Sequence, residues 1–410
     1  MADNLETLKS LRSFLNQHID EYEAAIVDRH KDRHGRAKLG QEIFNISSKI
    51  AELMLAPGDR VLRLSLAPIL NTALYVAIQL DLFNLIHEET DLSALAQKTG
   101  ADAILLLRIL RCLGAFHIFE QLSRDTFAST TQSEKLREPQ ARDFIKASFN
   151  IMHAENRMVP SILESNGFRS PVDRSENAAV RLWGKDMFEM MTENEEMRTQ
   201  FASAMSAQED LPPEMYPEFP FGEYVVNLSN DDTAVTMVDV GGGVGHVLKA
   251  ILQQNPGLPG RFVVQDVAPV VALVSPEVKS FEAMTHDFFE PQPVKGAKFY
   301  YIRHCLHDWT DEQCVSILKH LRDACTPTYS RILIHEFVLP ATGCGQREAL
   351  FDILMMSFCG MERDERQWQD ILTAAGLEVV YIWKADVGGY AIIEAAPVLD
   401  LPEISVETVP

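Results

Sequence analysis

The stretch Asp239-Val-Gly-Gly-Gly-Val-Gly-His246 decides the fold. It closes an apolar run that begins at Val235, and its glycines stand at positions 241, 242, 243 and 245. A glycine-rich turn at the carboxyl end of a first strand lets the backbone approach a nucleoside ligand closely. A dinucleotide fingerprint needs a further glycine where His246 stands, which disfavours NAD. Taken alone, a purely structural glycine turn stays the alternative.

The segments after this turn predict a doubly wound, Rossmann-like α/β domain over residues 221–410. Short apolar runs alternate with helical segments, which is typical of parallel strands joined by helices. The predicted strands are residues 235–240, 261–265, 298–303, 331–337, 378–384 and 390–395.

Two acids follow the glycine turn at positions that suit an adenosine. Asp266 ends the second strand, 21 residues after Gly245, where a carboxylate can accept hydrogen bonds from two ribose hydroxyls. Asp287 follows a short strand and could accept from an adenine amino group while Phe288 covers the ring. Each acid alone could be a strand-end cap. The ordered set, with no grip for phosphate, predicts S-adenosylmethionine as the cofactor.

The first 130 residues predict a helical winged-helix domain. Helices are expected over 5–26, 68–86, 91–100 and 102–111, with a solvated turn at 28–36 and a β-wing at 116–127. Gly100 is expected to close the helix over 91–100, and Asp102 to cap the next one. DNA binding is the alternative for such a module, but only Arg108 and Arg111 are cationic on the would-be recognition helix. Residues 131–220 predict a helical connector that contributes to the substrate pocket and ends in a proline-rich linker.

Composition limits the partners and the compartment. A chain of 410 residues favours two domains, and the net charge of -22 argues against nucleic acid and anionic lipid. The six cysteines lack CxxC spacing, and residues 1–28 lack a signal-peptide core, so a cytoplasmic protein is expected. No run of about 18 apolar residues is recognised, which predicts no membrane span.

The fourth strand leads into Tyr301-Ile-Arg-His-Cys-Leu-His-Asp-Trp-Thr-Asp-Glu-Gln-Cys314. Here the sequence resembles the small-molecule O-methyltransferases of the caffeate type from plants and the sterigmatocystin type from fungi. The resemblance covers nearly the whole chain and includes the motifs at 201–205, 332–336 and 362–368. Such enzymes are usually homodimers joined through the N-terminal domain, and they act on a hydroxyl of a small aromatic molecule, phenolic or polyketide.

The resemblance also implies roles for single residues. His307 matches the general base, Glu336 and Glu362 match two acids that orient it, and Arg303 matches a position whose backbone contacts the cofactor. The cofactor would further contact Gly241 and Gly243. Substrate-pocket positions are Met205, Asp352, Met355 and Met356, although methionines there could equally fill the core. His304 matches no family role, and no metal is expected. The rival function is a pericyclase or dehydratase that keeps the fold and the cofactor without methylating.

Overall fold

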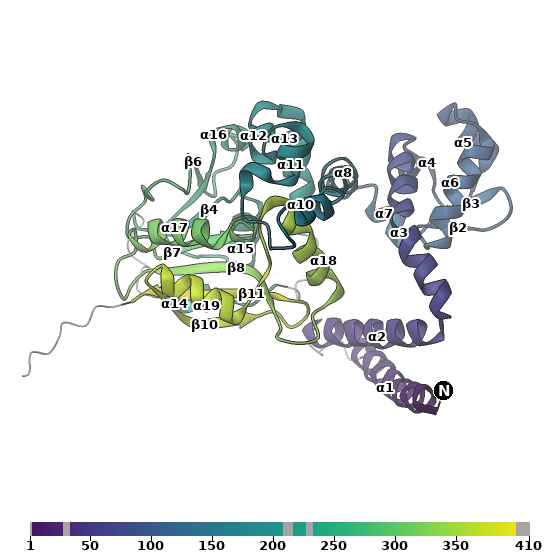
Figure 1. Ribbon diagram of the computed structural model, residues 1–410, viewed down its shortest axis with the longest axis horizontal. Coiled ribbons are helices and arrows are strands. Elements are labelled where there is room, and N and C mark those ends of the chain that lie inside the picture. Colours follow the sequence, from purple (N-terminus) through teal and green to yellow (C-terminus); the bar gives the residue numbers. More distant parts are fainter. Residues whose placement is uncertain (1, 28–32, 208–215, 227–232, 399–410) are drawn as a thin grey trace, which may run out of the picture. The chain divides into compact units, whose positions relative to one another are not determined.

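The computed structural model describes residues 2–27, 33–207, 216–226 and 233–398, and it divides into two compact units (Figure 1). The first unit contains residues 1–157 and 193–212, and the second contains residues 158–192 and 213–410. The predicted connector, residues 131–220, is thus shared between the units. The bounds of the three predicted segments (1–130, 131–220 and 221–410) stay a prediction.

The first unit is mainly helical. Its helices are α1 (Ala2–Val27), α2 (Arg33–Met54), α3 (Pro57–Gln79), α4 (Leu82–Leu85), α5 (Leu92–Thr99), α6 (Ala103–Ala115), α7 (Thr131–Lys135), α8 (Pro139–Ala147), η1 (Ser148–Met152), α9 (His153–Asn156) and α13 (Glu195–Ser206). Three short strands, β1 (Thr90–Asp91), β2 (Phe119–Gln121) and β3 (Thr126–Ser129), form an antiparallel sheet in the order β1-β3-β2.

The structure confirms the predicted caps Gly100 and Asp102 of this unit and adds a third, Asp91. Asp91 accepts a hydrogen bond from the backbone N–H of Ser93 at the start of α5, and Gly100 ends that helix with φ of 69°. Asp102 accepts from the backbone N–H of Leu105 at the start of α6. The β2–β3 hairpin lies where the wing was expected. The predicted turn at 28–36 lies partly outside the described residues, and α2 already begins at Arg33.

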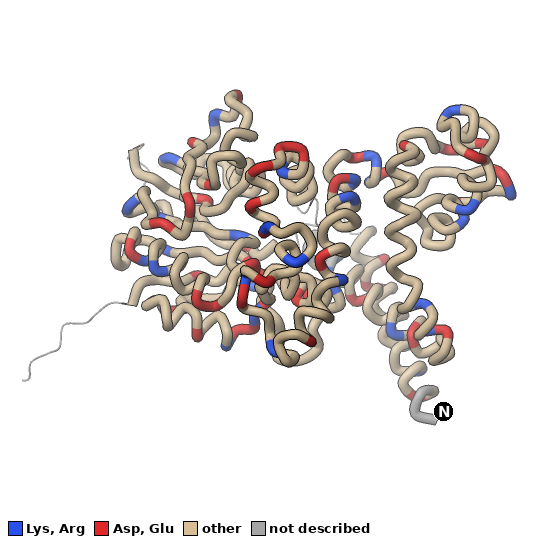
Figure 2. Tube along the Cα trace, turned by 45° about the horizontal axis from the view of Figure 1, so that its top comes forward, with Lys and Arg blue, Asp and Glu red and all other residues tan. Residues whose placement is uncertain are grey.

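Helix α3 corrects two predictions. It begins at Pro57, where a proline fits the first helical turn, and not at Pro68, which lies inside the helix. It is also long and apolar enough, by length and composition, to cross a membrane. The prediction that no such run exists was therefore wrong, because residues 64–79 carry no charge (Figure 2). Only 17% of the apolar window is buried.

The second unit is built on one large sheet. Its strands are β4 (Val235–Val240), β5 (Arg261–Asp266), β6 (Glu282–Thr285), β7 (Phe299–Arg303), β8 (Arg331–Leu339), β9 (Arg363–Asp364), β10 (Leu377–Lys384) and β11 (Tyr390–Pro397). Its helices are α10 (Val159–Ser165), η2 (Arg174–Glu176), α11 (Ala178–Trp183), α12 (Met187–Glu193), α14 (Phe221–Tyr224), α15 (His246–Gln254), α16 (Ala268–Val271), η6 (Leu306–Asp308), α17 (Asp311–Arg322), α18 (Gln346–Met355), η7 (Met356–Phe358) and α19 (Glu365–Ala374). The last residue of α12, Glu193, is counted with the first unit.

The sheet confirms the predicted doubly wound domain. Its order is β10-β11-β8-β7-β4-β5-β6, with β9 paired to the end of β8, and only β11 runs antiparallel to its neighbours. All six predicted strands are present, to within two residues at each end. Helices α17 and α19 pack on one face of the sheet, while α14 and α15 pack on the other. From β4 the chain continues to β5 and β6 on one side of β4, and it then crosses to β7 on the other side. The carboxyl end of β4 is therefore the switch point where ligands bind in such sheets.

Candidate active site

The glycine turn after β4 has the close packing that its composition predicts. Gly241, Gly243 and Gly245 have φ of 68°, 58° and 77°, which side-chain-bearing residues rarely adopt. A Cβ on Gly241 would lie 2.8 Å from the Sγ of Cys305, and one on Gly242 would lie 2.5 Å from the carboxylate of Asp239. The turn therefore presents bare backbone at the switch point.

Asp266 ends β5 beside this turn. Its carboxylate accepts hydrogen bonds from the backbone N–H groups of Gly243 at 2.9 Å and Val267 at 2.8 Å. Burial raises the pKa of Asp266, and these two backbone donors partly offset that rise. The ribose-binding position inferred from spacing is thus tied directly to the glycine turn.

Asp287 and Phe288 lie in the loop after β6. One carboxylate oxygen of Asp287 accepts from the backbone N–H of Phe289 at 3.0 Å, so the acid also caps a local turn. The ring of Phe288 lies 3.4 Å from the position that a Cβ on Gly241 would take. This loop is anchored by Gln265 and Gln292, whose buried amides exchange two hydrogen bonds of 2.8 Å.

Two oppositely charged groups near the turn are buried without a hydrogen-bond partner. Asp239 is 2% exposed, and its Oδ2 contacts no donor among the described residues. The Nε and Nη2 atoms of Arg303, at the end of β7, likewise contact no acceptor there, and the guanidinium lies over the ring of Tyr216. Burial raises the pKa of Asp239 to about 7, although Arg303 partly opposes the rise.

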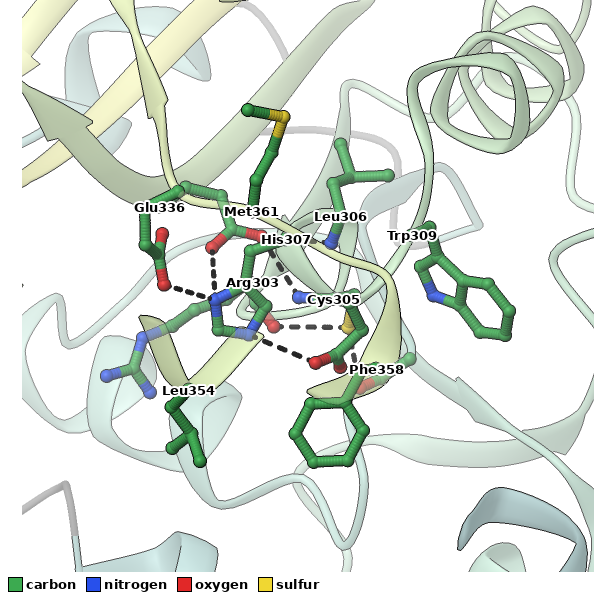
Figure 3. Close-up of polar contacts among 12 residues, drawn as sticks. Arg303, Cys305, Leu306, His307, Trp309, Glu336, Leu354, Phe358 and Met361 are labelled. Atoms are coloured by element: carbon green, nitrogen blue, oxygen red, sulfur yellow. Dashed lines mark hydrogen bonds and ion pairs between the residues drawn. The ribbon is translucent and has the colours of Figure 1, made fainter. Parts of the chain in front are cut away.

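His307 sits in η6 among carboxylates (Figure 3). Its Nδ1 lies 2.8 Å from Oε1 of Glu362 and 3.8 Å from Oε2 of Glu336. Its other ring nitrogen, Nε2, lies 3.7 Å from Oδ1 of Asp308. The three residues predicted to work together, His307, Glu336 and Glu362, are therefore brought into contact, and all three are at most 5% exposed.

These carboxylates control the proton on His307. Burial alone would lower the pKa of the imidazole, but Glu336, Glu362 and Asp308 outweigh it and raise that pKa well above its usual value. Burial also raises the pKa of Glu336, and Glu362 adds to the rise. The cluster as a whole holds a proton more tightly than its groups would in water.

The segment after η7 holds the His307 turn in place. The backbone N–H of Met361 donates to the carbonyl of His307 at 2.9 Å, and a Cβ on Gly360 would overlap that carbonyl. The fully buried Arg363 donates to the carbonyls of Leu306 at 3.1 Å and Trp309 at 2.8 Å. The backbone of η6 is thus fixed from one side.

Arg174 holds the same turn from another side. Its Nη1 donates to the carbonyls of Asp308 at 2.6 Å and Phe358 at 2.8 Å, while Nη2 pairs with Asp186 at 3.0 Å. The guanidinium also lies 4.0 Å from the ring centroid of Trp309. Sequence reasoning missed Arg174, because nothing in its neighbourhood forms a motif.

The predicted substrate positions fall in different places. Asp352 accepts from the backbone N–H of Glu362 at 3.0 Å, so it supports that acid. Met355 ends α18, where it is 4% exposed, and Met356 begins η7. Met205 lies on α13 in the first unit. Substrate contacts for these four residues stay a prediction. Sequence reasoning also passed over Asp239 and Asp308, although both stand inside the quoted motifs.

Comparisons with known proteins show the family of this chain. A family model described as an O-methyltransferase domain matches residues 170–378, and one described as an O-methyltransferase dimerisation domain matches residues 62–138. The chain belongs to the O-methyltransferase family. It is an S-adenosylmethionine-dependent O-methyltransferase, of a family that serves fungal secondary metabolism.

Curated relatives of this O-methyltransferase include demethylsterigmatocystin 6-O-methyltransferase of Aspergillus flavus, 35% identical over 82% of this chain and 88% of the relative. O-methyltransferase penC of Penicillium thymicola is 32% identical over 91% and 95%. The solved structure of OxaC with SAH and oxaline is 25% identical, with a TM-score of 0.79 over 95% of this chain and all of that one. A structure described as a pericyclic reaction enzyme has a TM-score of 0.80 over 96% of this chain and all of that one, but at 24% identity it shows the fold alone.

Proposed function

We propose that this enzyme transfers a methyl group from S-adenosylmethionine to a hydroxyl of a small aromatic metabolite, phenolic or polyketide, with His307 as general base. The bond between Nδ1 of His307 and Glu362 carries the proposal. A neutral imidazole that donates Nδ1–H to a carboxylate keeps its lone pair on Nε2, where it can accept a proton from the substrate.

The buried polar groups around the glycine turn fit the cofactor. Asp266 would hold the ribose, and Asp287 with Phe288 would hold the adenine. The amino-acid end is a zwitterion, and the unpartnered Asp239 and Arg303 offer one charge of each sign, for its ammonium and its carboxylate. S-adenosylmethionine, when bound, supplies a methyl group made electrophilic by a sulfonium.

The protein's part in the reaction is to remove the acceptor's proton. A phenol has a pKa of about 10 and is a poor nucleophile at neutral pH, so a positioned base accelerates attack. His307 would take the proton on Nε2, and Glu362 would stabilise the imidazolium that forms. Because the carboxylates raise the pKa of His307, the base becomes available only as the pH rises.

The relatives support the proposed class of acceptor, and the family match together with the exposed apolar surface of α3 supports the proposed homodimer. The relatives include an enzyme named for demethylsterigmatocystin, which makes aromatic polyketides the first acceptors to test. The dimerisation match begins at residue 62 and covers most of α3, where Leu62, Leu64, Leu66 and Ile69 are each more than half exposed. An exposed apolar patch of this kind suits a partner, and we propose a cytoplasmic homodimer that binds neither nucleic acid nor membrane.

Replacement of His307 by alanine tests the base directly. The variant should bind S-adenosylhomocysteine as the wild type does, because the cofactor groups lie elsewhere, and should turn over at least about 100-fold more slowly. Calorimetry measures the binding, and methyl transfer to an aromatic polyketide measures the rate. A full-rate variant would mean that another group, or proximity alone, does this work.

A further inference from the structure

His304 brings a second imidazole to the catalytic cluster. One ligand atom from each of His304, His307 and Glu336 lies within 4.8 Å of the other two. No ligand cluster was expected from the sequence, because its spacing matches no metal motif. The fold creates the grouping by placing the end of β8 beside the turn that follows β7.

His304 is held in an uncommon backbone conformation. Its φ is 48°, in the left-handed region that side-chain-bearing residues rarely adopt. Its ring packs edge to face against His307 and Tyr390, with centroids 5.1 Å apart in both pairs. Its Nε2 is buried and has no hydrogen-bond partner among the described residues. Burial, reinforced by Arg303, lowers the pKa of His304 well below its usual value.

Glu336 presents one free carboxylate oxygen to the two histidines. Its Oε1 accepts hydrogen bonds of 3.0 Å from the backbone N–H groups of Cys305 and Leu306, which fixes the orientation of the carboxylate. Its Oε2 has no hydrogen-bond partner in the described part of the chain, although the side chain is fully buried. Such an anchored carboxylate resembles a metal ligand oriented by its surroundings.

We propose that His304, His307 and Glu336 form a binding site for a first-row transition-metal dication such as Zn²⁺, and that its occupation stops methyl transfer. Two imidazoles and a carboxylate are ligands that Zn²⁺ prefers. A tetrahedral ion about 2.1 Å from each ligand needs ligand pairs about 3.4 Å apart. The present separations of at most 4.8 Å must therefore close by no more than about 1.4 Å.

The charge of the cluster also favours a dication. Glu362 lies 2.8 Å from Nδ1 of His307, so a second buried carboxylate stands beside the three ligands. A buried carboxylate is stabilised by a cation beside it, and a dication bound between the imidazoles and these acids would supply one.

Metal binding would stop His307 from acting as the general base. This part of the inference rests on the proposed function. A dication binds the lone pair of Nδ1 only in the tautomer of His307 whose single ring proton has moved from Nδ1 to Nε2. The ring has no lone pair left to accept the substrate's proton. Zn²⁺ should therefore inhibit without displacing the cofactor, whose contacts lie around the glycine turn.

Calorimetric titration of the full-length protein with zinc chloride tests the site independently of activity. The wild type should show one saturable site, and His304→Ala should weaken it at least about 100-fold, since loss of a direct ligand should cost at least as much as loss of its support. His304→Gln keeps more of the volume and serves as a second variant. His286→Ala removes an imidazole outside the cluster and should bind Zn²⁺ as the wild type does. Unchanged melting temperature and unchanged S-adenosylhomocysteine affinity establish that each variant is folded.

Equal Zn²⁺ affinity in the wild type and both His304 variants would overturn the proposal, as would a wild type that binds no Zn²⁺. Zinc inhibition of methyl transfer should disappear in His304→Ala, and inhibition that persists there would also count against the site. A wild type that binds Zn²⁺ through His304 but transfers no methyl group would refute the proposed function and leave the metal site standing.

Discussion

Replacing Glu362 with glutamine should slow methyl transfer about 10- to 150-fold. Glutamine keeps the size of the side chain and an oxygen that can accept from Nδ1 of His307, so the 2.8 Å contact can persist. The negative charge that stabilises the imidazolium is lost. A hydrogen bond to a charged group is worth about 1.5–3 kcal/mol, and each 1.36 kcal/mol is tenfold in rate, which gives the stated range.

The assay is the pH profile of kcat/KM for an aromatic acceptor. The wild-type profile should rise with pH because the neighbouring carboxylates raise the pKa of His307 and only the neutral ring is a base. In Glu362→Gln the rise should move to lower pH and the plateau should fall. Glu365→Gln is the matched control, since Glu365 is exposed and pairs with Lys384 on the surface. A Glu362→Gln enzyme with the wild-type plateau and profile would refute the reasoning.

Three further predictions concern the cofactor and the assembly. Asp266→Ala should weaken S-adenosylhomocysteine binding at least about 100-fold by calorimetry in a folded protein, because two hydroxyl contacts to a carboxylate are lost; unchanged affinity contradicts the assignment. Wild-type affinity for S-adenosylhomocysteine should fall as the pH drops below about 7, where Asp239 takes up a proton, and Asp239→Asn should remove that dependence. Light scattering should report about twice 46.1 kDa, and a monomer at micromolar concentration would contradict the homodimer.

Local signals predicted the sheet and the glycine turn well. Strand β4 has the predicted bounds because a β-branched apolar run ends at the glycines, and the caps Asp91 and Asp102 are short-range chemistry that a sequence displays directly. Helix α3 was misread because Pro68 was taken as a start, although the helix runs through this proline. Its apolar surface was overlooked for the same reason, since the predicted helix left out residues 57–67.

The parts of the site that could not be predicted from the sequence depend on contacts between distant segments. The acids Glu336 and Glu362 were found through motifs, but the separate roles of the two Glu336 oxygens depend on backbone donors that only the folded chain supplies. Arg174 reaches the His307 turn from 134 residues away in sequence, and no local pattern announces it. His304 was proposed as a metal ligand because its backbone is left-handed and its Nε2 has no hydrogen-bond partner among the described residues. Neither feature can be predicted from the residue type.

The most direct test of the central claim is mass spectrometry of an aromatic polyketide acceptor, with demethylsterigmatocystin first, after incubation with methyl-labelled S-adenosylmethionine. A fungal extract serves as the acceptor pool if that compound does not react. We expect the wild type to form a product carrying one labelled methyl group on oxygen, and His307→Ala to form at least about 100-fold less in the same time. An acceptor that is transformed while the label stays on the cofactor would contradict methyl transfer and identify a pericyclase or dehydratase on this fold.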